Sequence, residues 1–541
     1  MTRERLYLYD TTLRDGQQTQ GVVFSAVDKH QIAIALDALG IDQIEGGWPG
    51  ANPTDSEFFE HSPTLTQATL TAFGMTKRAG RSAANDDVLA AVLNAGTSTV
   101  CLVGKSYDFH VTTALGITLD ENVTNISESI AHIVSAGREA LFDAEHFFDG
   151  YVANPDYALT YLRAALEAGA RWFVLCDTNG GTLPGRIRDI VREVIAAGIP
   201  GDRLGIHTHN DTGTGVAGAL AAIEAGARHV QGTINGLGER CGNANLTSLI
   251  PKLLLKEPYA SQFSFGIERN NLSALTALSR QLDEILNRNP NPNAPYVGAS
   301  AFAHKAGLHA SAILKDPTTD EHVPPEAVGN TRVIPMSNQA GRSNLKRRLA
   351  EASLQVAADD PRLGVVLARI KAREDQGYAY DSAAASFELV ARDVLGARPD
   401  FFTLDRYRVT VEKRRDAVGE PITVSEAVVA LMVHGRRTVN VADSFYDGGL
   451  VDQGPVHALS AALRHDLGDY DAMIADMKLV DFKVSITGGG TEAVTRVLID
   501  SEDGQGRRWS TVGVSANIVD ASFQALVEAI EWKLIREGAT L

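Results

Sequence analysis

The feature of this sequence that most constrains its fold is an alternation that runs from the N-terminus to about residue 256. A short apolar or β-branched stretch is followed by an amphipathic stretch with helical spacing, and Gly or Pro marks most junctions. The eight predicted strands are Leu6–Asp10, Gln43–Glu45, Thr69–Phe73, Thr99–Val103, Ala140–Phe147, Trp172–Asp177, Leu204–His209 and His229–Asn235. A doubly wound sheet would fit the same alternation, but a count of eight favours a (β/α)8 TIM barrel.

The rest of the 541-residue chain predicts further domains, because the chain is too long for one ordinary core. Asn289–Pro295 cannot sustain a helix or a central strand and is typical of a linker. From about Phe401 a strand-strand-strand-helix pattern occurs twice, with the helices at Val456–Arg464 and Asp520–Arg536. We therefore expect a TIM barrel at 1–270, helical linker subdomains at 271–400 and an α+β C-terminal domain at 401–541.

Charge and cysteine usage exclude several classes of protein. The formal net charge of −17 argues against a surface for nucleic acid or for an anionic membrane. The three cysteines, Cys101, Cys176 and Cys241, are too scattered for a disulfide framework or a cysteine-based zinc motif. Met1–Gly16 has no apolar signal segment, and no run of about 18 apolar residues could span a bilayer. We expect a cytoplasmic protein.

Polar and titratable side chains gather where the predicted strands end. In parallel α/β folds these carboxyl ends share one face of the sheet, where binding sites lie. A solvated loop would explain each residue by itself, but it explains the whole set poorly. The residues are Asp10, Arg14, Asp15, Glu45, Glu145, His146, Asp177, Thr178, His207, His209, Asn235 and Asn243.

The side chains of His207 and His209 project the same way from their strand, since they are two residues apart. Such a pair can be a hydrogen-bonded couple or can bind one divalent metal. Asp15 could add a carboxylate oxygen and Asn243 a carbonyl oxygen, and a mixed O/N site suits Mg²⁺, Mn²⁺ or Zn²⁺. Arg14 would bring a fixed positive charge to the place where an oxyanion develops. This set indicates carbon–carbon bond chemistry at a keto group, or metal-assisted hydrolysis.

Three segments resemble signatures of the alpha-isopropylmalate, homocitrate and citramalate synthase family. Leu13–Gln18 followed by Lys29 resembles the first signature, His207–Gly213 the second, and Gly236–Asn243 the third. The tail from residue 481 to 534 is similar to the family's C-terminal regulatory and dimerisation domain, so the resemblance covers nearly the whole chain. Within the family, Thr319–Asn330 and the chain length look most like the longer citramalate synthase branch.

The resemblance implies a Claisen-type condensation of acetyl-CoA with a 2-oxo acid, followed by hydrolysis of the thioester. Pyruvate as acceptor would give (R)-citramalate for isoleucine biosynthesis, whereas 2-oxoisovalerate or 2-oxoglutarate would give the other products of the family. The resemblance also implies a homodimer and a branched-chain amino acid, such as isoleucine or leucine, as effector. A metal-dependent lyase or aldolase on the same barrel, and a non-catalytic sensor, are the alternatives.

The resemblance also implies roles for individual residues. The metal ligands would be Asp15, His207, His209 and Asn243, and Arg14 would stabilise the alkoxide that forms from the keto oxygen. Glu145 matches the glutamate near the acetyl-CoA methyl group and is the candidate base; the alternative is a rim carboxylate paired with a basic neighbour. Thr178 would contact the oxo-acid carboxylate. His309 matches a histidine that assists proton transfer, or else packs locally. Asp320 stands where the family usually has a tyrosine, and His322 is the other candidate for that tyrosine's role.

Overall fold

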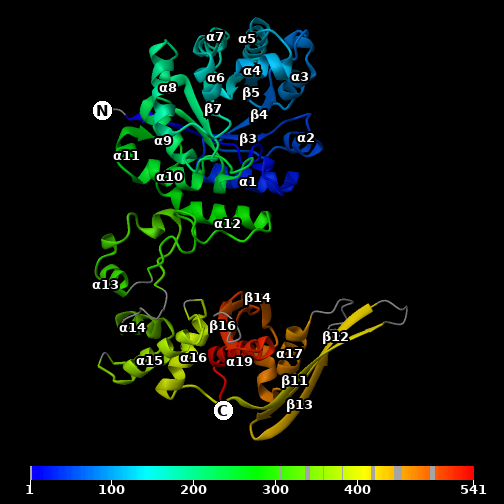
Figure 1. Ribbon diagram of the computed structural model, residues 1–541, viewed down its shortest axis with the longest axis vertical. Helices are drawn as coiled ribbons and strands as arrows, with labels where there is room; N and C mark the ends of the chain where they lie inside the picture. The colour runs from blue at the N-terminus through cyan, green and yellow to red at the C-terminus, as the bar shows by residue number, and fades with distance from the viewer. Residues whose placement is uncertain are drawn as a thin grey trace. The chain divides into compact units, whose positions relative to one another are not determined.

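The computed structural model describes residues 3–304, 307–334, 342–357, 359–380, 382–415, 421–443, 454–487 and 494–540. They form two compact units (Figure 1). The first unit is Met1–Phe302 with His322–Arg332, and the second is Ala303–Glu321 with Val333–Leu541. The chain therefore leaves the first unit, returns to it for one short segment and leaves it again.

Eight parallel strands of the first unit close into a barrel, which confirms the predicted TIM-barrel fold. The strands are β2 (Tyr7–Asp10), β3 (Gln43–Gly47), β4 (Thr69–Met75), β5 (Thr99–Lys105), β6 (Glu139–Glu145), β7 (Trp172–Asp177), β8 (Leu204–Thr208) and β9 (His229–Gly232). Strand β2 pairs with both β3 and β9, which completes the ring. A separate parallel pair, β1 (Glu4–Arg5) and β10 (Phe263–Ser264), lies outside it.

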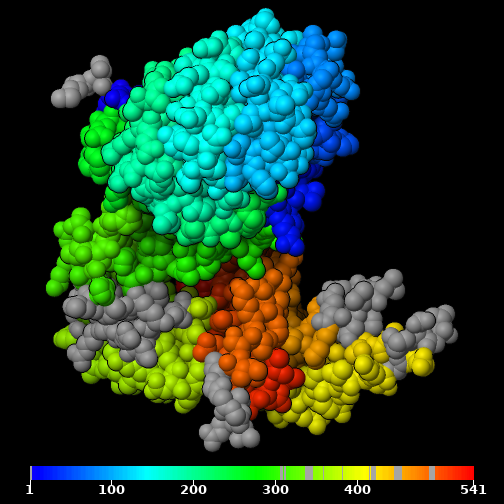
Figure 2. Space-filling view, turned by 45° about the horizontal axis from the view of Figure 1, so that its top comes forward, coloured from blue at the N-terminus to red at the C-terminus, as the bar shows by residue number. Residues whose placement is uncertain are grey.

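Helices form the outer layer of this unit (Figure 1). Figure 2 shows one face of the molecule, with the residues of this unit coloured from blue to green. The helices are α1 (Ala26–Leu39), α2 (Pro53–Glu60), α3 (Asp87–Asn94), α4 (Asp108–His110), α5 (Leu119–Ser135), α6 (Phe147–Ala153), α7 (Pro155–Glu167), α8 (Pro184–Ala196), α9 (Gly215–Ala225), α10 (Leu246–Leu255), α11 (Tyr259–Gln262) and α12 (Leu275–Ile285). Residues such as Leu36, Leu89 and Ile130 point inward from these helices and are buried in one apolar core with the outward-facing side chains of the strands. Burial of this apolar stripe is what holds each helix on the sheet.

Three predicted strands end earlier in the structure than the sequence pattern indicates, and for the seventh the difference is one residue, because β8 ends at Thr208. The fifth predicted strand extends to Phe147, but β6 ends at Glu145 because His146 adopts a left-handed conformation with φ of 58° and α6 begins at Phe147. The eighth extends to Asn235, but β9 ends at Gly232 because a 3₁₀ turn over Ile234–Gly236 follows it. A left-handed residue cannot continue the extended backbone of a strand.

The second unit contains helices followed by two antiparallel sheets. The helices are α13 (Gly307–Lys315), α14 (Arg342–Glu351), α15 (Arg362–Asp375) and α16 (Ala384–Leu395). The sheets and their helices are β11 (Phe402–Arg415), β12 (Pro421–Val433), β13 (Arg436–Asp443), α17 (Pro455–Arg464) and α18 (Asp471–Ile474), then β14 (Lys478–Thr487), β15 (Val494–Glu502), β16 (Arg508–Ser515) and α19 (Ile518–Arg536). The predicted pattern of three strands and a helix, occurring twice, is confirmed.

The predicted three-part division of the chain stays a prediction. Helix α12 lies in the first compact unit, although its residues follow the predicted boundary at 270. Among the helices that the structure describes, none has the length and apolar character that a bilayer crossing requires.

Candidate metal centre and active site

Three buried side chains of ligand type meet at the carboxyl ends of the barrel strands. One carboxylate oxygen of Asp15 and one ring nitrogen each of His207 and His209 lie within 4.8 Å of one another. Asp15 follows β2, whereas His207 belongs to β8 and His209 comes directly after it. Asn243 joins them from the loop after β9, where its Nδ2 donates to Asp15 Oδ2 at 2.6 Å. The fold thus brings together all four residues that were predicted to bind a metal.

The loop after β2 is a tight turn that its own sequence stabilises. The carboxylate of Asp10 accepts hydrogen bonds from the Thr12 N–H at 2.9 Å and from the Thr12 hydroxyl at 2.8 Å. The carbonyl of Thr11 accepts from the N–H groups of Arg14 at 3.2 Å and Asp15 at 2.9 Å. An Asx-type turn of this kind fixes the backbone locally, so Arg14 and Asp15 are held next to each other at the end of the strand.

The loop after β9 reaches the cluster through a glycine. Gly242 has a φ of 84°, and a Cβ atom there would lie 1.9 Å from the carbonyl oxygen of Gly236. Its own carbonyl accepts from the Asn210 N–H at 2.8 Å. Only glycine can adopt this backbone conformation and also approach another carbonyl so closely. Gly242 thus lets the loop bring the side-chain amide of the next residue, Asn243, next to Asp15.

The donor set fits a divalent cation. Nε2 of His207 lies 3.4 Å from Nε2 of His209 and 3.2 Å from Asp15 Oδ2. Two buried polar atoms in the cluster, His209 Nδ1 and Asn243 Oδ1, have no hydrogen-bond partner in the described part of the chain. Turning the Asn243 amide over would direct Oδ1 toward Asp15 and His207, because amide oxygen and nitrogen exchange places in such a turn. The resulting oxygen and nitrogen set suits Mg²⁺, Mn²⁺ or Zn²⁺.

The electrostatics of Asp15 and His209 favour forms that can bind a metal. Burial by itself raises the pKa of Asp15, but the charge of Arg14 and the hydrogen bond with His207 outweigh burial and hold that pKa well below its usual range. Burial and the neighbouring His207 lower the pKa of His209 to about 4. At neutral pH Asp15 is therefore a carboxylate and His209 a neutral imidazole, which are the protonation states that ligands need.

A fixed positive charge lies beside the cluster. Arg14 donates from Nε to Glu45 Oε1 at 2.5 Å, and its guanidinium carbon lies 3.8 Å from the centre of the Phe73 ring. Its Nη1 is 3.6 Å from Asp15 Oδ1. Burial by itself lowers the pKa of Arg14, but the carboxylates of Glu45 and Asp15 raise it by more. The pKa therefore lies above its usual value, and the side chain stays charged. A charge held this way needs no reorganisation when an oxyanion forms next to it.

The predicted base, Glu145, is paired with a lysine. Glu145 is the last residue of β6, and its Oε2 lies 2.5 Å from Nζ of Lys105, the last residue of β5. These two residues face each other in the parallel register of the two strands. The pairing matches the alternative interpretation of a rim carboxylate beside a basic neighbour, and it leaves the role of Glu145 as a base a prediction.

Thr178 lies one strand further along the same rim. Its Oγ1 accepts the backbone N–H of His146 at 2.8 Å, so the end of β7 is tied to the residue after Glu145. Its carbonyl accepts from Arg240, which also pairs with Asp211. A hydroxyl that accepts one hydrogen bond still has its own proton to donate, so Thr178 can present an O–H to a carboxylate.

His309 and His322 belong to different compact units. His309 belongs to α13 in the second unit, where its Nδ1 lies 2.7 Å from Asp320 Oδ1 and its side chain is 56% exposed. His322 belongs to the first unit, where its ring packs edge-on against Tyr296. The predicted proton-transfer role of His309 stays a prediction, and Asp320 is its hydrogen-bond partner.

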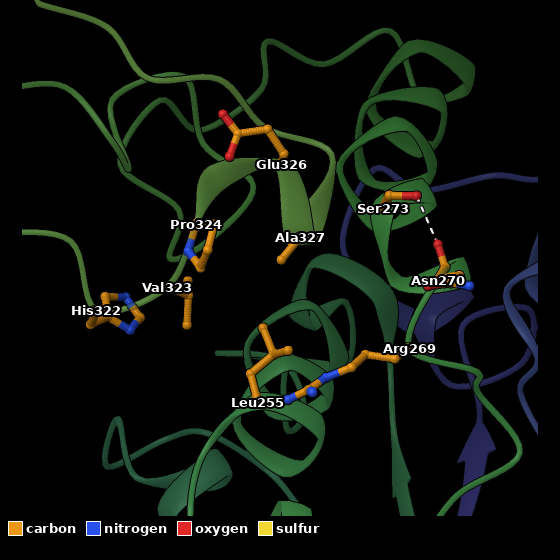
Figure 3. A pocket seen from close by; sticks show the side chains of 9 residues that line it. All are labelled: Leu255, Arg269, Asn270, Ser273, His322, Val323, Pro324, Glu326 and Ala327. Atoms are coloured by element: carbon orange, nitrogen blue, oxygen red, sulfur yellow. Dashed lines mark hydrogen bonds between the residues drawn. The ribbon is translucent and has the colours of Figure 1, made fainter. Parts of the chain in front are cut away.

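His322 also lines a cavity of about 580 Å³ (Figure 3). The cavity lies at the C-terminal end of α10, beside Leu255, whereas Asn243 precedes the N-terminus of that helix. Ten helical residues rise about 15 Å. The cavity therefore belongs to the opposite end of α10 from the metal cluster, and so does His322.

Sequence reasoning placed Glu45 at the strand ends but missed that Cys101 and Asp143 lie close to it. Glu45, Cys101 and Asp143 offer ligand-type atoms within 4.8 Å of one another, all buried. Glu45 also accepts the Tyr9 hydroxyl at 2.5 Å, and Gln231 donates to Asp143 at 3.1 Å. The signal that could have found Asp143 is strand alternation. Asp143 and Glu145 are two residues apart on one strand, so both side chains face the same side of the sheet.

Comparisons with known proteins agree with this architecture. A family model described as HMGL-like matches residues 5–278, one described as homocitrate synthase post-HMGL domain-like matches 296–378, and the LeuA allosteric (dimerisation) domain matches 381–534. The (R)-citramalate synthase of Synechocystis sp. is 48% identical over 98% of this chain and 96% of its own. That of Aquifex aeolicus is 46% identical over 99% and 98%. A probable 2-isopropylmalate synthase of Methanopyrus kandleri is 30% identical over 97% and 98%.

The fold and these likenesses define the class: an enzyme with an HMGL-like TIM barrel and a C-terminal LeuA dimerisation domain. The level of identity over the full length is higher for the citramalate synthases than for the isopropylmalate synthase. The chain belongs to the (R)-citramalate synthase family.

Proposed function

We propose that this protein condenses acetyl-CoA with pyruvate and water to give (R)-citramalate and CoA, in isoleucine biosynthesis. The observation that carries the proposal is the buried cluster of Asp15, His207 and His209 beside Arg14, at the rim of a barrel whose full-length relatives carry the name (R)-citramalate synthase. Asp15, His207, His209 and Asn243 would hold the divalent metal, whose chemistry there is Lewis-acid polarisation of a keto group.

In this proposal the residues of the chain divide the work of a Claisen condensation. Glu145 takes a proton from the methyl group of acetyl-CoA, and the carbanion attacks the keto carbon of pyruvate. Arg14 stabilises the negative charge that develops on the keto oxygen. Thr178 donates its hydroxyl proton to the carboxylate of pyruvate and orients the keto carbon. Water then cleaves the thioester, so that CoA leaves as the thiol and the product is a dicarboxylate.

Lys105 supports the role of Glu145 in this scheme. Its ammonium group holds one carboxylate oxygen at the strand end, with 32% of the lysine side chain exposed and 26% of the glutamate. A partly exposed pair of this kind contributes little to folding stability, so its position at the rim is better explained by orientation of the carboxylate. His309 would assist proton transfer.

The test of the proposed reaction is the initial rate of CoA release with a panel of 2-oxo acids. We expect the highest kcat/KM with pyruvate. A clear preference for 2-oxoisovalerate or 2-oxoglutarate would assign the chain to another activity of the wider family. Cleavage of a hydroxyacyl-CoA without condensation would favour the lyase alternative.

The partners form part of the same proposal. We propose a homodimer that pairs through the C-terminal domain, which is supported by the match to a dimerisation domain.

The second unit also contains a cavity of about 1360 Å³, whose lining includes Ile474, Met477 and Phe482 together with the charged Asp466 and Lys478. Apolar walls with charges of both signs suit a zwitterionic branched-chain amino acid, and isoleucine or leucine is the proposed effector. A cytoplasmic location is supported by the three free cysteines.

A further inference from the structure

A chain of three buried side chains runs from His207 into the interior of the barrel. The Nδ1 atom of His207 lies 2.8 Å from the amide oxygen of Gln231, and the Gln231 amide nitrogen donates to Asp143 Oδ1 at 3.1 Å. The residues belong to β8, β9 and β6, so the chain crosses the barrel. Their exposures are 5%, 0% and 3%, so water does not compete for these hydrogen bonds.

The carboxylate of Asp143 decides which way the Gln231 amide points. An ionised carboxylate only accepts hydrogen bonds, so the amide must turn its NH₂ group toward Asp143 and its oxygen toward His207. The distance of 3.1 Å from Gln231 Nε2 to Asp143 Oδ1 is that of an amide N–H donating to a carboxyl oxygen, while burial and the charge of Glu45 raise the pKa of Asp143. The orientation of the glutamine therefore follows from its neighbours.

The orientation of Gln231 in turn fixes the tautomer of His207. An amide oxygen facing Nδ1 requires that Nδ1 carries a ring proton, so Nε2 is the ring nitrogen that can give its lone pair to a metal. Nε2 is the atom that lies 3.2 Å from Asp15 and 3.4 Å from His209. By contrast, Nδ1 of His209 has no partner in the described part of the chain. Only one of the two imidazoles is fixed in this way.

We propose that Gln231, held by Asp143, is a positioning residue that keeps Nε2 of His207 directed at the metal. The inference rests on the proposed metal site formed by Asp15, His207, His209 and Asn243. Gln231 would not touch substrate or metal; it would act through the histidine. Hydrogen-bond partners behind a metal ligand typically contribute about 10–100-fold to metal affinity.

The barrel offers a matched control at its other end. His229 Nε2 lies 3.0 Å from the amide oxygen of Gln43, and the Gln43 amide donates to Glu139 at 3.3 Å. Gln43 and His229 are the first residues of β3 and β9, so this histidine, glutamine and carboxylate set lies away from the strand ends that carry the cluster. Gln43 is 6% exposed, so removing its amide disturbs the fold much as removing that of Gln231 does.

The test is calorimetric titration of the full-length protein with Mn²⁺ alone, without substrates. Gln231→Met should raise the Kd for Mn²⁺ by about 10–100-fold, whereas Gln43→Met should leave it unchanged. Equal loss in both variants, or none in Gln231→Met, would overturn the inference. If the unaltered protein binds no Mn²⁺, the proposed metal site itself fails, which is a separate outcome.

A reciprocal double variant guards against simple misfolding. Gln231→Glu combined with Asp143→Asn exchanges the amide and the carboxylate, so that His207 Nδ1–H still has an acceptor and that acceptor still has a donor behind it. We expect Mn²⁺ affinity close to that of the unaltered protein. A double variant that folds, as judged by circular dichroism, but binds Mn²⁺ as weakly as Gln231→Met would contradict the positioning role.

Discussion

At the scale of single residues, Arg14 makes several contacts whose roles can be distinguished by experiment. It donates to Glu45, lies over Phe73 and faces Asp15. The first two contacts hold the guanidinium in place, and the third places it at the cluster. A residue whose charge is fixed by buried neighbours is suited to meet an anion that exists only in the transition state.

Replacing Arg14 should therefore lower turnover. We expect Arg14→Met to reduce kcat for CoA release by about 10²–10³-fold, because one donor to the developing oxyanion is lost. The matched control is Arg171→Met: Arg171 also lies 3.8 Å from the centre of an aromatic ring, that of Trp172 at the start of β7. Steady-state kinetics with pyruvate check both, and unchanged kcat in Arg14→Met would remove Arg14 from the mechanism.

Glu145 can be tested in the same assay. As a general base it should contribute about 10²–10⁴-fold to kcat, so Glu145→Gln should lose that much. Asp149 is a second rim carboxylate, 3.5 Å from His146 Nδ1, and Asp149→Asn should keep kcat. If both variants retain full activity, Glu145 is only the partner of Lys105.

At the scale of elements, loop geometry decides which ligands meet. The turn after β2 is built from local hydrogen bonds, so its sequence alone is a sufficient signal for Arg14 and Asp15. The loop after β9 depends on close backbone contact between Gly236 and Gly242. In the sequence this contact is indicated only by the presence of glycine at both positions.

Gly242→Ala should weaken both folding and metal binding. The new methyl group meets the Gly236 carbonyl, and the residue keeps a left-handed φ, which costs about 1–3 kcal/mol for a strained backbone. Gly213→Ala is the control, because Gly213 has a φ of 73° but a methyl group there would meet no other atom within 4 Å. Mn²⁺ titration and thermal unfolding should both separate the two variants. Equal Mn²⁺ affinities would show that the loop accommodates the methyl group.

A buried glutamate joins two helices of the second unit and makes its stability depend on pH. Glu528 of α19 accepts a hydrogen bond from Ser386 of α16, and burial raises its pKa to about 7. The folded state therefore holds a proton that the unfolded state loses near pH 4.5, so stability falls as pH rises between about 4.5 and 7.

Glu528→Gln should remove this loss. Urea unfolding at pH 8 should show the variant more stable than the unaltered protein by on the order of 2–3 kcal/mol, and the two should converge near pH 4. Glu537→Gln should behave in the opposite way, since Lys533 and Arg507 lower the pKa of Glu537 and its stabilising contribution is present only above its unfolded pKa. The same pH trend in both variants would contradict the assignment.

At the scale of the whole molecule, the C-terminal domain is expected to regulate an activity that it does not perform. The proposed effector cavity and the metal cluster belong to different compact units, so an effect of one on the other must pass through the chain or the dimer. Coupling between two such sites typically changes affinity by about 5–150-fold.

Isoleucine or leucine should inhibit CoA release, and filling the cavity should abolish that inhibition. Ser460→Phe places a ring in the cavity and should leave the uninhibited rate unchanged. Val365→Phe is the control, because Val365 is 54% exposed on α15 of the same unit and does not line the cavity. If no branched-chain amino acid changes the rate, the effector proposal is wrong. Sedimentation equilibrium should give a dimer in all three proteins.

The sequence by itself determined the barrel, the repeated C-terminal pattern and the four clustered ligand-type residues. The reason is that burial periodicity and turn chemistry act over a few residues, so an apolar strand that is followed by Asp15, or that carries His207 near its end, can be recognised from its own segment. These patterns can be recognised in a short segment without knowledge of the rest of the chain.

The tertiary structure alone decided what lies behind and beside those residues. The contact of Gln231 with Asp143 crosses the barrel, and the contact of Glu145 with Lys105 depends on the register of two strands. The ends of β6 and β9 depend on left-handed residues at His146 and Asn235. Packing between segments that are distant in sequence sets each of these features. Such packing produces no periodic pattern in the amino-acid sequence.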